Sequence, residues 1–107
     1  MEYTYTGFEN KLASEHLKNG ETCKLIGIGN SMTPILKSKQ PVIVVPVTDD
    51  TVLKKKDIVF CKVNGRYYLH LIHSIRNNTT FLIGNNHGHM NGWINRSNIF
   101  GIVKKIM

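Results

Sequence analysis

The dipeptide Asn64-Gly65 constrains the fold of this chain more than any other feature, because it separates two runs of strand-forming residues. The runs cover residues 57–63 and 66–75, and both are rich in β-branched and aromatic side chains. An Asn-Gly pair favours a two-residue type I′ turn, since both central residues of that turn need a positive φ. The sequence therefore predicts a β-hairpin in the middle of the chain.

Further short runs with a two-residue period predict strands at residues 22–28, 42–47, 79–83 and 98–105. Asn77-Asn78 marks another turn. Pro41 and Pro46 bracket the second of these runs, so we expect a short or edge strand there. Many short strands separated by turn signals are typical of a mainly β fold, here a curled antiparallel sheet or a small half-open β-barrel.

Residues 6–18 follow a helical period instead. Within residues 6–18 the apolar side chains recur at near-helical spacing, and Asn19-Gly20 then supplies a helix stop. These apolar residues are Phe8, Leu12, Ala13 and Leu17. We expect one N-terminal helical segment in residues 1–20 and a β-domain in residues 21–107, which together form a single domain over residues 1–107.

Composition excludes several classes of protein. Cys23 and Cys61 are the two cysteines, and their spacing fits neither a disulfide framework nor a zinc finger. The N-terminus has no apolar leader segment, and no stretch approaches the roughly 20 apolar residues of a membrane span. We therefore expect a cytoplasmic protein that makes no contact with a membrane.

The charge is strongly basic, with 14 Lys and Arg against 7 Asp and Glu. The densest clusters are Lys54-Lys55-Lys56 and Lys104-Lys105. This balance favours an anionic ligand such as a nucleotide, a nucleic acid or an acidic protein surface. Scattered charge that only aids solubility is the alternative.

The hexapeptide Gly-Asn-Ser-Met-Thr-Pro, at residues 29–34, is the main chemical signal. A serine in a tight turn after a strand can present its hydroxyl together with backbone N–H groups, as a nucleophile with an oxyanion site requires. Ser31 is therefore the candidate nucleophile, with Asn30 and Met32 beside it in the oxyanion loop. Taken alone, the hexapeptide fits an ordinary polar turn equally well.

Several motifs in the same order make the chain resemble the LexA/signal peptidase superfamily of serine peptidases. The hexapeptide is followed by a β-branched strand at 42–45, KKKDIV at 54–59, LHLI at 69–72, GNN at 84–86 and FGIV at 100–103. This resemblance implies the curled β fold of that superfamily, with Ser31 as nucleophile and a general base on the 69–72 strand. The run GNNHGHMNGW at 84–93 also resembles a segment of small phage and bacterial members, which implies a phage origin.

The general-base position carries His70, where most bacterial members of the superfamily have lysine. Similar eukaryotic-type signal peptidases use histidine there, and the ordinary histidine pKa of about 6.5 suits a base near neutral pH. Side chains alternate along a strand, so His70 and His73 point to opposite faces and at most one faces Ser31. A half-buried histidine bonded to the backbone is the structural alternative.

The third triad position is a departure from the family. Histidine-type members supply an aspartate from a Gly-Asp-Asn turn, and the matching residue here is Asn85. An Asp-to-Asn change in the serine-protease template costs about 10⁴ in rate. Asp57 is another nearby carboxylate, although its position usually shapes a turn. The resemblance therefore implies a slow enzyme or none.

The polar segment 84–93 supplies the candidate binding residues Asn86, His87, His89 and Trp93, and we expect it to cap the active groove. His87 and His89 could chelate a metal with His70 or Cys61. The loop lacks a carboxylate and a compact zinc signature, so we predict neither a metal nor another cofactor.

Two functions follow from these features. The leading hypothesis is a serine endopeptidase that cleaves a peptide or protein in trans, with the substrate extended beside residues 42–47. Ser31 would attack, His70 would act as general base, and the Ser31 backbone N–H would serve the oxyanion. The alternative is a catalytically weak or inactive module on the same fold that binds a nucleotide, a nucleic acid or a host protein.

Overall fold

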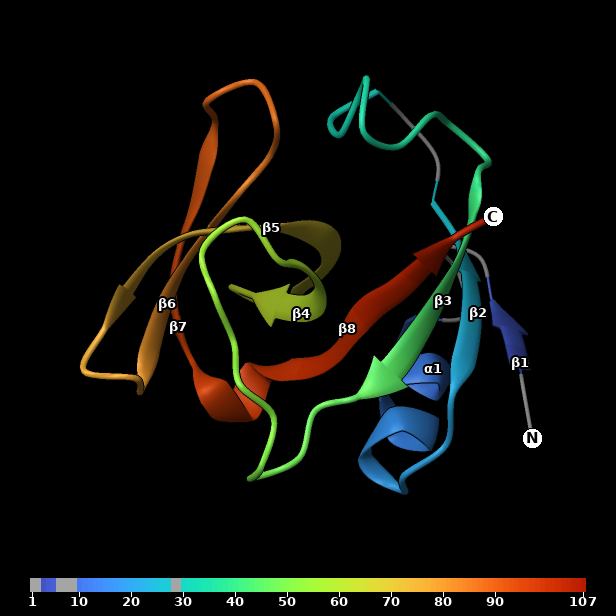
Figure 1. The fold of residues 1–107 in the computed structure, drawn as a ribbon, viewed down its shortest axis with the longest axis horizontal. Coiled ribbons are helices and arrows are strands. Elements are labelled where there is room, and N and C mark those ends of the chain that lie inside the picture. Colours follow the sequence, from blue (N-terminus) through green and yellow to red (C-terminus); the bar gives the residue numbers. More distant parts are fainter. Residues whose placement is uncertain (1–2, 6–9, 28–29) are drawn as a thin grey trace.

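Eight strands form one continuous curled sheet in the computed structural model, which describes residues 3–5, 10–27 and 30–107 (Figure 1). The strands are β1 (Tyr3–Tyr5), β2 (Cys23–Ile26), β3 (Pro41–Pro46), β4 (Ile58–Val63), β5 (Arg66–Arg76), β6 (Thr80–Gly84), β7 (Met90–Asn95) and β8 (Ile99–Ile106). The helix α1 (Asn10–Lys18) precedes β2, and a 3₁₀ turn (Arg96–Asn98) precedes β8. The predicted mainly β fold with one short N-terminal helix is confirmed.

The strand order is β1-β2-β3-β8-β4-β5-β6-β7, and every neighbouring pair except β1 and β2 is antiparallel. Of the expected short or edge strand at residues 42–47, the short strand is present as the six-residue β3, but it is not at an edge, because β3 pairs with β2 on one side and with β8 on the other. Pro41 and Pro46 occupy the first and last positions of β3. A missing N–H disturbs the ladder least at these ends, so the prolines are compatible with a central strand.

The two predicted turns are present, and both have the backbone geometry that their sequences favour. Asn64 and Gly65, between β4 and β5, have φ values of 50° and 81°. Asn77 and Asn78, between β5 and β6, have φ values of 52° and 56°. Asparagine and glycine tolerate these left-handed conformations better than other residues, so local sequence alone determines both hairpins.

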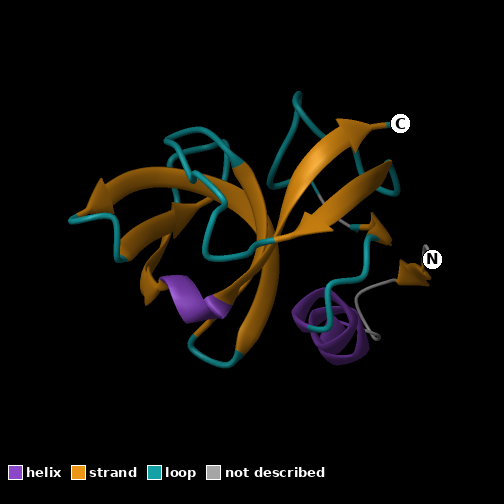
Figure 2. Ribbon diagram, turned by 60° about the horizontal axis from the view of Figure 1, so that its bottom comes forward, coloured by secondary structure: helices purple, strands orange, loops and turns teal. Residues whose placement is uncertain are grey.

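Two hydrophobic cores lie on opposite faces of the curled sheet, and Figure 2 shows the strands spreading into two lobes from a shared centre. The central strand β4 contributes to both, since Phe60 packs in the first core while Val59 and Cys61 pack in the second. A strand buried on both faces is typically a continuous apolar run, as the first four residues of β4, Ile-Val-Phe-Cys, are. The first core contains Met32, from the turn after β2, and Leu71, from the centre of β5.

The helix α1 packs on the first core through Ala13 and Leu17, both fully or almost fully buried. Leu12, which we expected on the same apolar face, is 48% exposed. Gly20 has a φ of 85° and follows the last turn, as the Asn-Gly stop signal predicts. Phe8 and the rest of residues 6–9 lie outside the described residues. Within the described ranges, no helix has both the length and the apolar character needed to cross a bilayer.

Candidate active site

Ser31 and His70 are 39 residues apart in the sequence and meet in the structure. Ser31 lies in the turn region after β2, and His70 lies on β5. The Ser31 Oγ–H group donates to His70 Nε2 over 3.1 Å. This separation is within the range needed for a histidine to take the proton of a serine hydroxyl.

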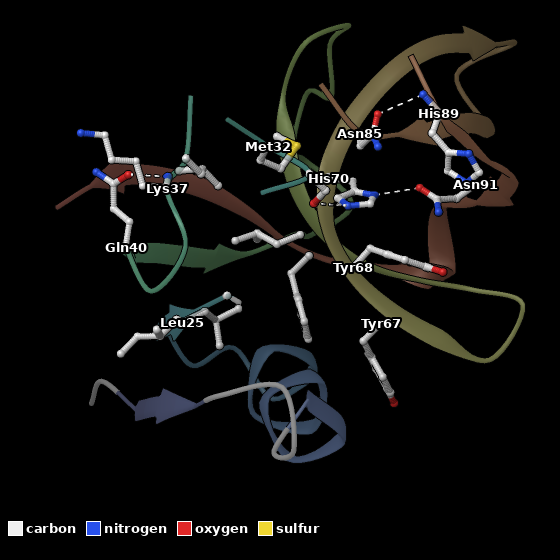
Figure 3. A pocket seen from close by; sticks show the side chains of 16 residues that line it. Leu25, Met32, Lys37, Gln40, Tyr67, Tyr68, His70, Asn85, His89 and Asn91 are labelled. Carbon is white, nitrogen blue, oxygen red and sulfur yellow. Dashed lines mark hydrogen bonds between the residues drawn. The ribbon is translucent and has the colours of Figure 1, made fainter. Parts of the chain in front are cut away.

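Asn91, and not Asn85, contacts the other nitrogen of His70. His70 Nδ1–H donates to Asn91 Oδ1 over 2.7 Å, as Figure 3 shows. Asn85 instead closes its own loop, because its Oδ1 accepts the backbone N–H groups of His87 and His89 at 2.8 and 3.0 Å. The expected contact of Asn85 with His70 is therefore wrong, and Asn91, which the sequence does not single out, makes this contact instead.

A β-bulge explains why Asn91 reaches His70. In the pairing of β6 with β7, Ile83 is opposite Gly92 while Gly84 is opposite Met90, which leaves Asn91 as the extra residue. A bulge redirects the side chain of the extra residue, and bulges recur beside active sites for this reason. A second bulge falls at His73 in the pairing of β5 with β6.

His73 does not face Ser31. Its Nε2–H donates to the backbone carbonyl of Asn85 over 2.8 Å, which anchors the start of the loop that leads to Asn91. Asp57 is not part of the site either, since its Oδ2 accepts the Lys54 backbone N–H at 2.8 Å within a turn. No described group of three or more His, Cys, Asp or Glu side chains is arranged to hold a metal ion.

Burial controls the charge on His70, which is only 7% exposed. Desolvation of the ring lowers the pKa of His70 below its ordinary value of 6.5. The hydrogen bond to Asn91 acts in the opposite direction, and the charges of His89 and His73 lower the pKa further. The ring of Tyr68 covers one side of His70, with ring centroids 4.8 Å apart. His70 is therefore held neutral near physiological pH, as a general base requires.

The loop between β6 and β7 holds the turn that carries Ser31. The backbone N–H of Asn86 donates to the carbonyl of Ser31, and its side-chain Nδ2 donates to the carbonyl of Thr33, both over 2.9 Å. His87 Nε2 lies 3.1 Å from both the Asn30 carbonyl and Thr33 Oγ1. Two of the predicted binding residues, Asn86 and His87, thus contact this turn and hold it in position.

A cavity of about 530 Å³ opens beside Ser31 and His70 (Figure 3). Met32, which is buried, forms part of its apolar wall together with Leu25 and Leu36. His89 also lines it, as predicted for a binding residue. Trp93 does not. Its indole is 41% exposed, lines a separate shallow hollow and packs under Arg76, whose guanidinium carbon lies 4.2 Å from a ring centroid.

Among the described residues, part of β5 presents a free strand edge to the cavity. Residues Arg66–Leu71 of β5 pair with β4 on one side, but pairing with β6 on the other side starts only at Leu71. Tyr67, Tyr68 and Leu69 therefore present an unpaired edge among the described residues, and all three line the cavity. The predicted addition of substrate beside residues 42–47 is wrong, because both edges of β3 are already occupied.

Two comparisons of the sequence with known proteins give no match. A scan against models of protein families finds no match, and a search of curated proteins finds no match either.

Proposed function

We propose that this chain is a serine endopeptidase-like domain of the LexA/signal peptidase type, which cleaves a peptide or protein in trans through Ser31 and His70. The observation that supports it best is the aligned contact of Ser31 Oγ, the buried His70 ring and Asn91 Oδ1 beside a cavity with a free strand edge. The cytoplasmic location and phage origin inferred from the sequence belong to this proposal.

Asn91 sets the tautomer that the reaction needs. Because Asn91 Oδ1 accepts the Nδ1 proton, the Nε2 lone pair of His70 remains free to accept a proton from Ser31. Ser31 Oγ forms a bond to the peptide carbonyl carbon while Nε2 takes its proton, and the Ser31 backbone N–H stabilises the oxyanion. The C–N bond then breaks as the imidazolium returns the proton to the leaving amine. Water activated by His70 hydrolyses the acyl ester on Ser31.

The substrate would bind along the free edge of β5. An extended peptide added beside Tyr67–Leu69 would make main-chain hydrogen bonds that lead directly toward His70 and Ser31. Apolar side chains of that peptide would pack against the wall formed by Leu25, Met32 and Leu36. This is the usual way in which a strand edge supplies affinity while adjacent pockets supply specificity.

The amide of Asn91 also favours a second function. An amide orients the imidazole but carries no negative charge to stabilise the imidazolium, so turnover would be slow. A catalytically weak or inactive module that binds a nucleotide, a nucleic acid or a host protein in the same cavity is therefore the alternative. The net charge of +7 is compatible with a nucleotide, a nucleic acid or an acidic surface of a host protein.

Labelling with a fluorophosphonate, followed by intact-mass measurement, distinguishes the two functions. The wild-type chain should gain one adduct, Ser31→Ala should gain none, and His70→Ala should label far more slowly. Ser97→Ala, at an exposed serine outside the cavity, is the matched control and should label like the wild type. An adduct that persists in Ser31→Ala would show that the nucleophile is misassigned. A folded wild-type chain that never labels would refute the peptidase and favour the binding module.

A further inference from the structure

We propose that the cavity selects an acidic peptide, an extended segment that carries aspartate or glutamate side chains. This inference rests on the proposed function for the cleavage step, whereas peptide binding by itself does not depend on it. Three features of the cavity support it: the distribution of carboxylates, the position of lysines at its two ends, and the packing of its tyrosines.

Carboxylates are absent from all the segments that form the cavity. The sequence has no Asp or Glu between Glu21 and Asp49, and none after Asp57. Every described residue that lines the cavity lies in one of these two acid-free stretches, between Leu25 and Gln40 or between Phe60 and Asn91. A substrate carboxylate entering the cavity therefore meets no acidic side chain among the described residues that line it.

Lysines lie near both ends of the same cavity. Lys37 is exposed and lines one end, and Figure 3 shows it beside Gln40, across the cavity from His89 and Asn91. The exposed Lys39 is fixed nearby, because its backbone N–H donates to the carbonyl of the cavity-lining Gly27 over 2.7 Å.

Lys62 lines the separate hollow beside Trp93, and its Nζ lies 5.3 Å from the ring centroid of the cavity-lining Tyr67. A concave site with charge of one sign and apolar walls concentrates field lines and attracts the opposite charge. Acidic side chains on either flank of the scissile bond would therefore be stabilised.

A peptide fits these features better than a nucleic acid. Single-stranded nucleic acids bind through aromatic rings that are free to stack on bases. Here Tyr67 is stacked on Phe60, with ring centroids 5.7 Å apart and planes within 14°, and Tyr68 packs against His70. The free main-chain edge beside these tyrosines instead suits an extended peptide.

Binding of matched peptides to the full-length Ser31→Ala chain tests the inference without turnover. Three fluorescent peptides of equal length would share an apolar centre and differ only in flanking Glu, Gln or Lys residues. We expect the Glu peptide to bind about tenfold more tightly than the Gln peptide, and the Lys peptide to bind more weakly than either. The advantage of the Glu peptide should disappear at high salt.

Two double variants with the same change of net charge locate the effect. Lys37→Gln with Lys39→Gln should reduce the preference for the Glu peptide several-fold. Lys54→Gln with Lys55→Gln removes two positive charges from a turn that does not line the cavity, and should leave the preference unchanged.

The outcomes separate this inference from the peptidase proposal. Equal binding of the three peptides would overturn the inference, as would displacement of the Glu peptide by a tighter-binding single-stranded oligonucleotide. Ser31-dependent cleavage of all three peptides at equal rates would support the peptidase and overturn the acidic preference. Selective binding of the Glu peptide by a wild-type chain that cleaves none of them would support the inference and refute the peptidase.

Discussion

Replacing Asn91 with aspartate would supply the carboxylate that the candidate triad lacks. The two side chains have nearly the same shape, so Asn91→Asp places a carboxylate oxygen where Oδ1 now lies, 2.7 Å from His70 Nδ1. The carboxylate would stabilise the imidazolium that forms when His70 takes the proton of Ser31. We therefore expect acylation of Ser31 to become faster.

The size of the increase follows from the charge pair. Charges whose centres are about 4 Å apart interact by about 4 kcal/mol at an effective dielectric constant of about 20, which corresponds to about 10³ in rate. The site is largely buried, since His70 is 7% exposed, so loss of carboxylate hydration subtracts part of this gain. We expect an increase of about 10²- to 10³-fold, below the roughly 10⁴ of the serine-protease template.

The rate of labelling by an uncharged fluorophosphonate, followed by intact mass, measures this effect without a substrate. Asn85→Asp is the matched control, because it introduces the same charge into the same cavity without touching His70. Its carboxylate can still accept the N–H groups of His87 and His89, so the loop should keep its shape. We expect no comparable gain in this variant. The acid limb of the labelling profile should also move to higher pH in Asn91→Asp alone, since a neighbouring carboxylate raises the pKa of a histidine.

Two results would refute this reasoning. An Asn91→Asp chain that unfolds at the wild-type temperature but labels no faster would show that the His70 contact does not limit the reaction. An equal acceleration in Asn85→Asp would show that a general field in the cavity, and not the bond to Nδ1, is responsible.

Two further predictions concern pH and packing. The rate of wild-type labelling should fall on acidification with a midpoint below pH 6.5, because burial lowers the pKa of His70 and only the neutral ring accepts a proton. His89→Gln should raise that midpoint, because it removes a like charge near His70. Gly101→Ala should destabilise the fold by about 1–3 kcal/mol in thermal unfolding, because its Cβ would lie 2.4 Å from Val44 Cγ1. Gly27→Ala, whose Cβ meets no described atom within 4 Å, should unfold near the wild-type temperature.

A wild-type midpoint at or above 6.5 would contradict the inferred desolvation of His70. Equal unfolding temperatures for Gly101→Ala and Gly27→Ala would show that β8 and β3 can separate without cost, contrary to their close contact at Gly101.

The sequence by itself determined the local elements of this protein. Asn64-Gly65 and Asn77-Asn78 predicted their hairpins because the preference of these residues for positive φ does not depend on the rest of the chain. Strand alternation likewise separated His70 from His73, and only His70 contacts Ser31 in the structure. The catalytic roles of Ser31 and His70 stay predictions that the labelling experiment will test.

The tertiary structure alone decided which residues meet. Asn91 reaches His70 through a bulge between β6 and β7, and the register of that pair depends on contacts between the two strands. The central place of β3 and the free edge of β5 also follow from the order of strands in the sheet. Local propensities do not encode strand order, because it is selected by long-range burial of apolar faces, and for this reason motif spacing pointed to Asn85 and to residues 42–47 instead.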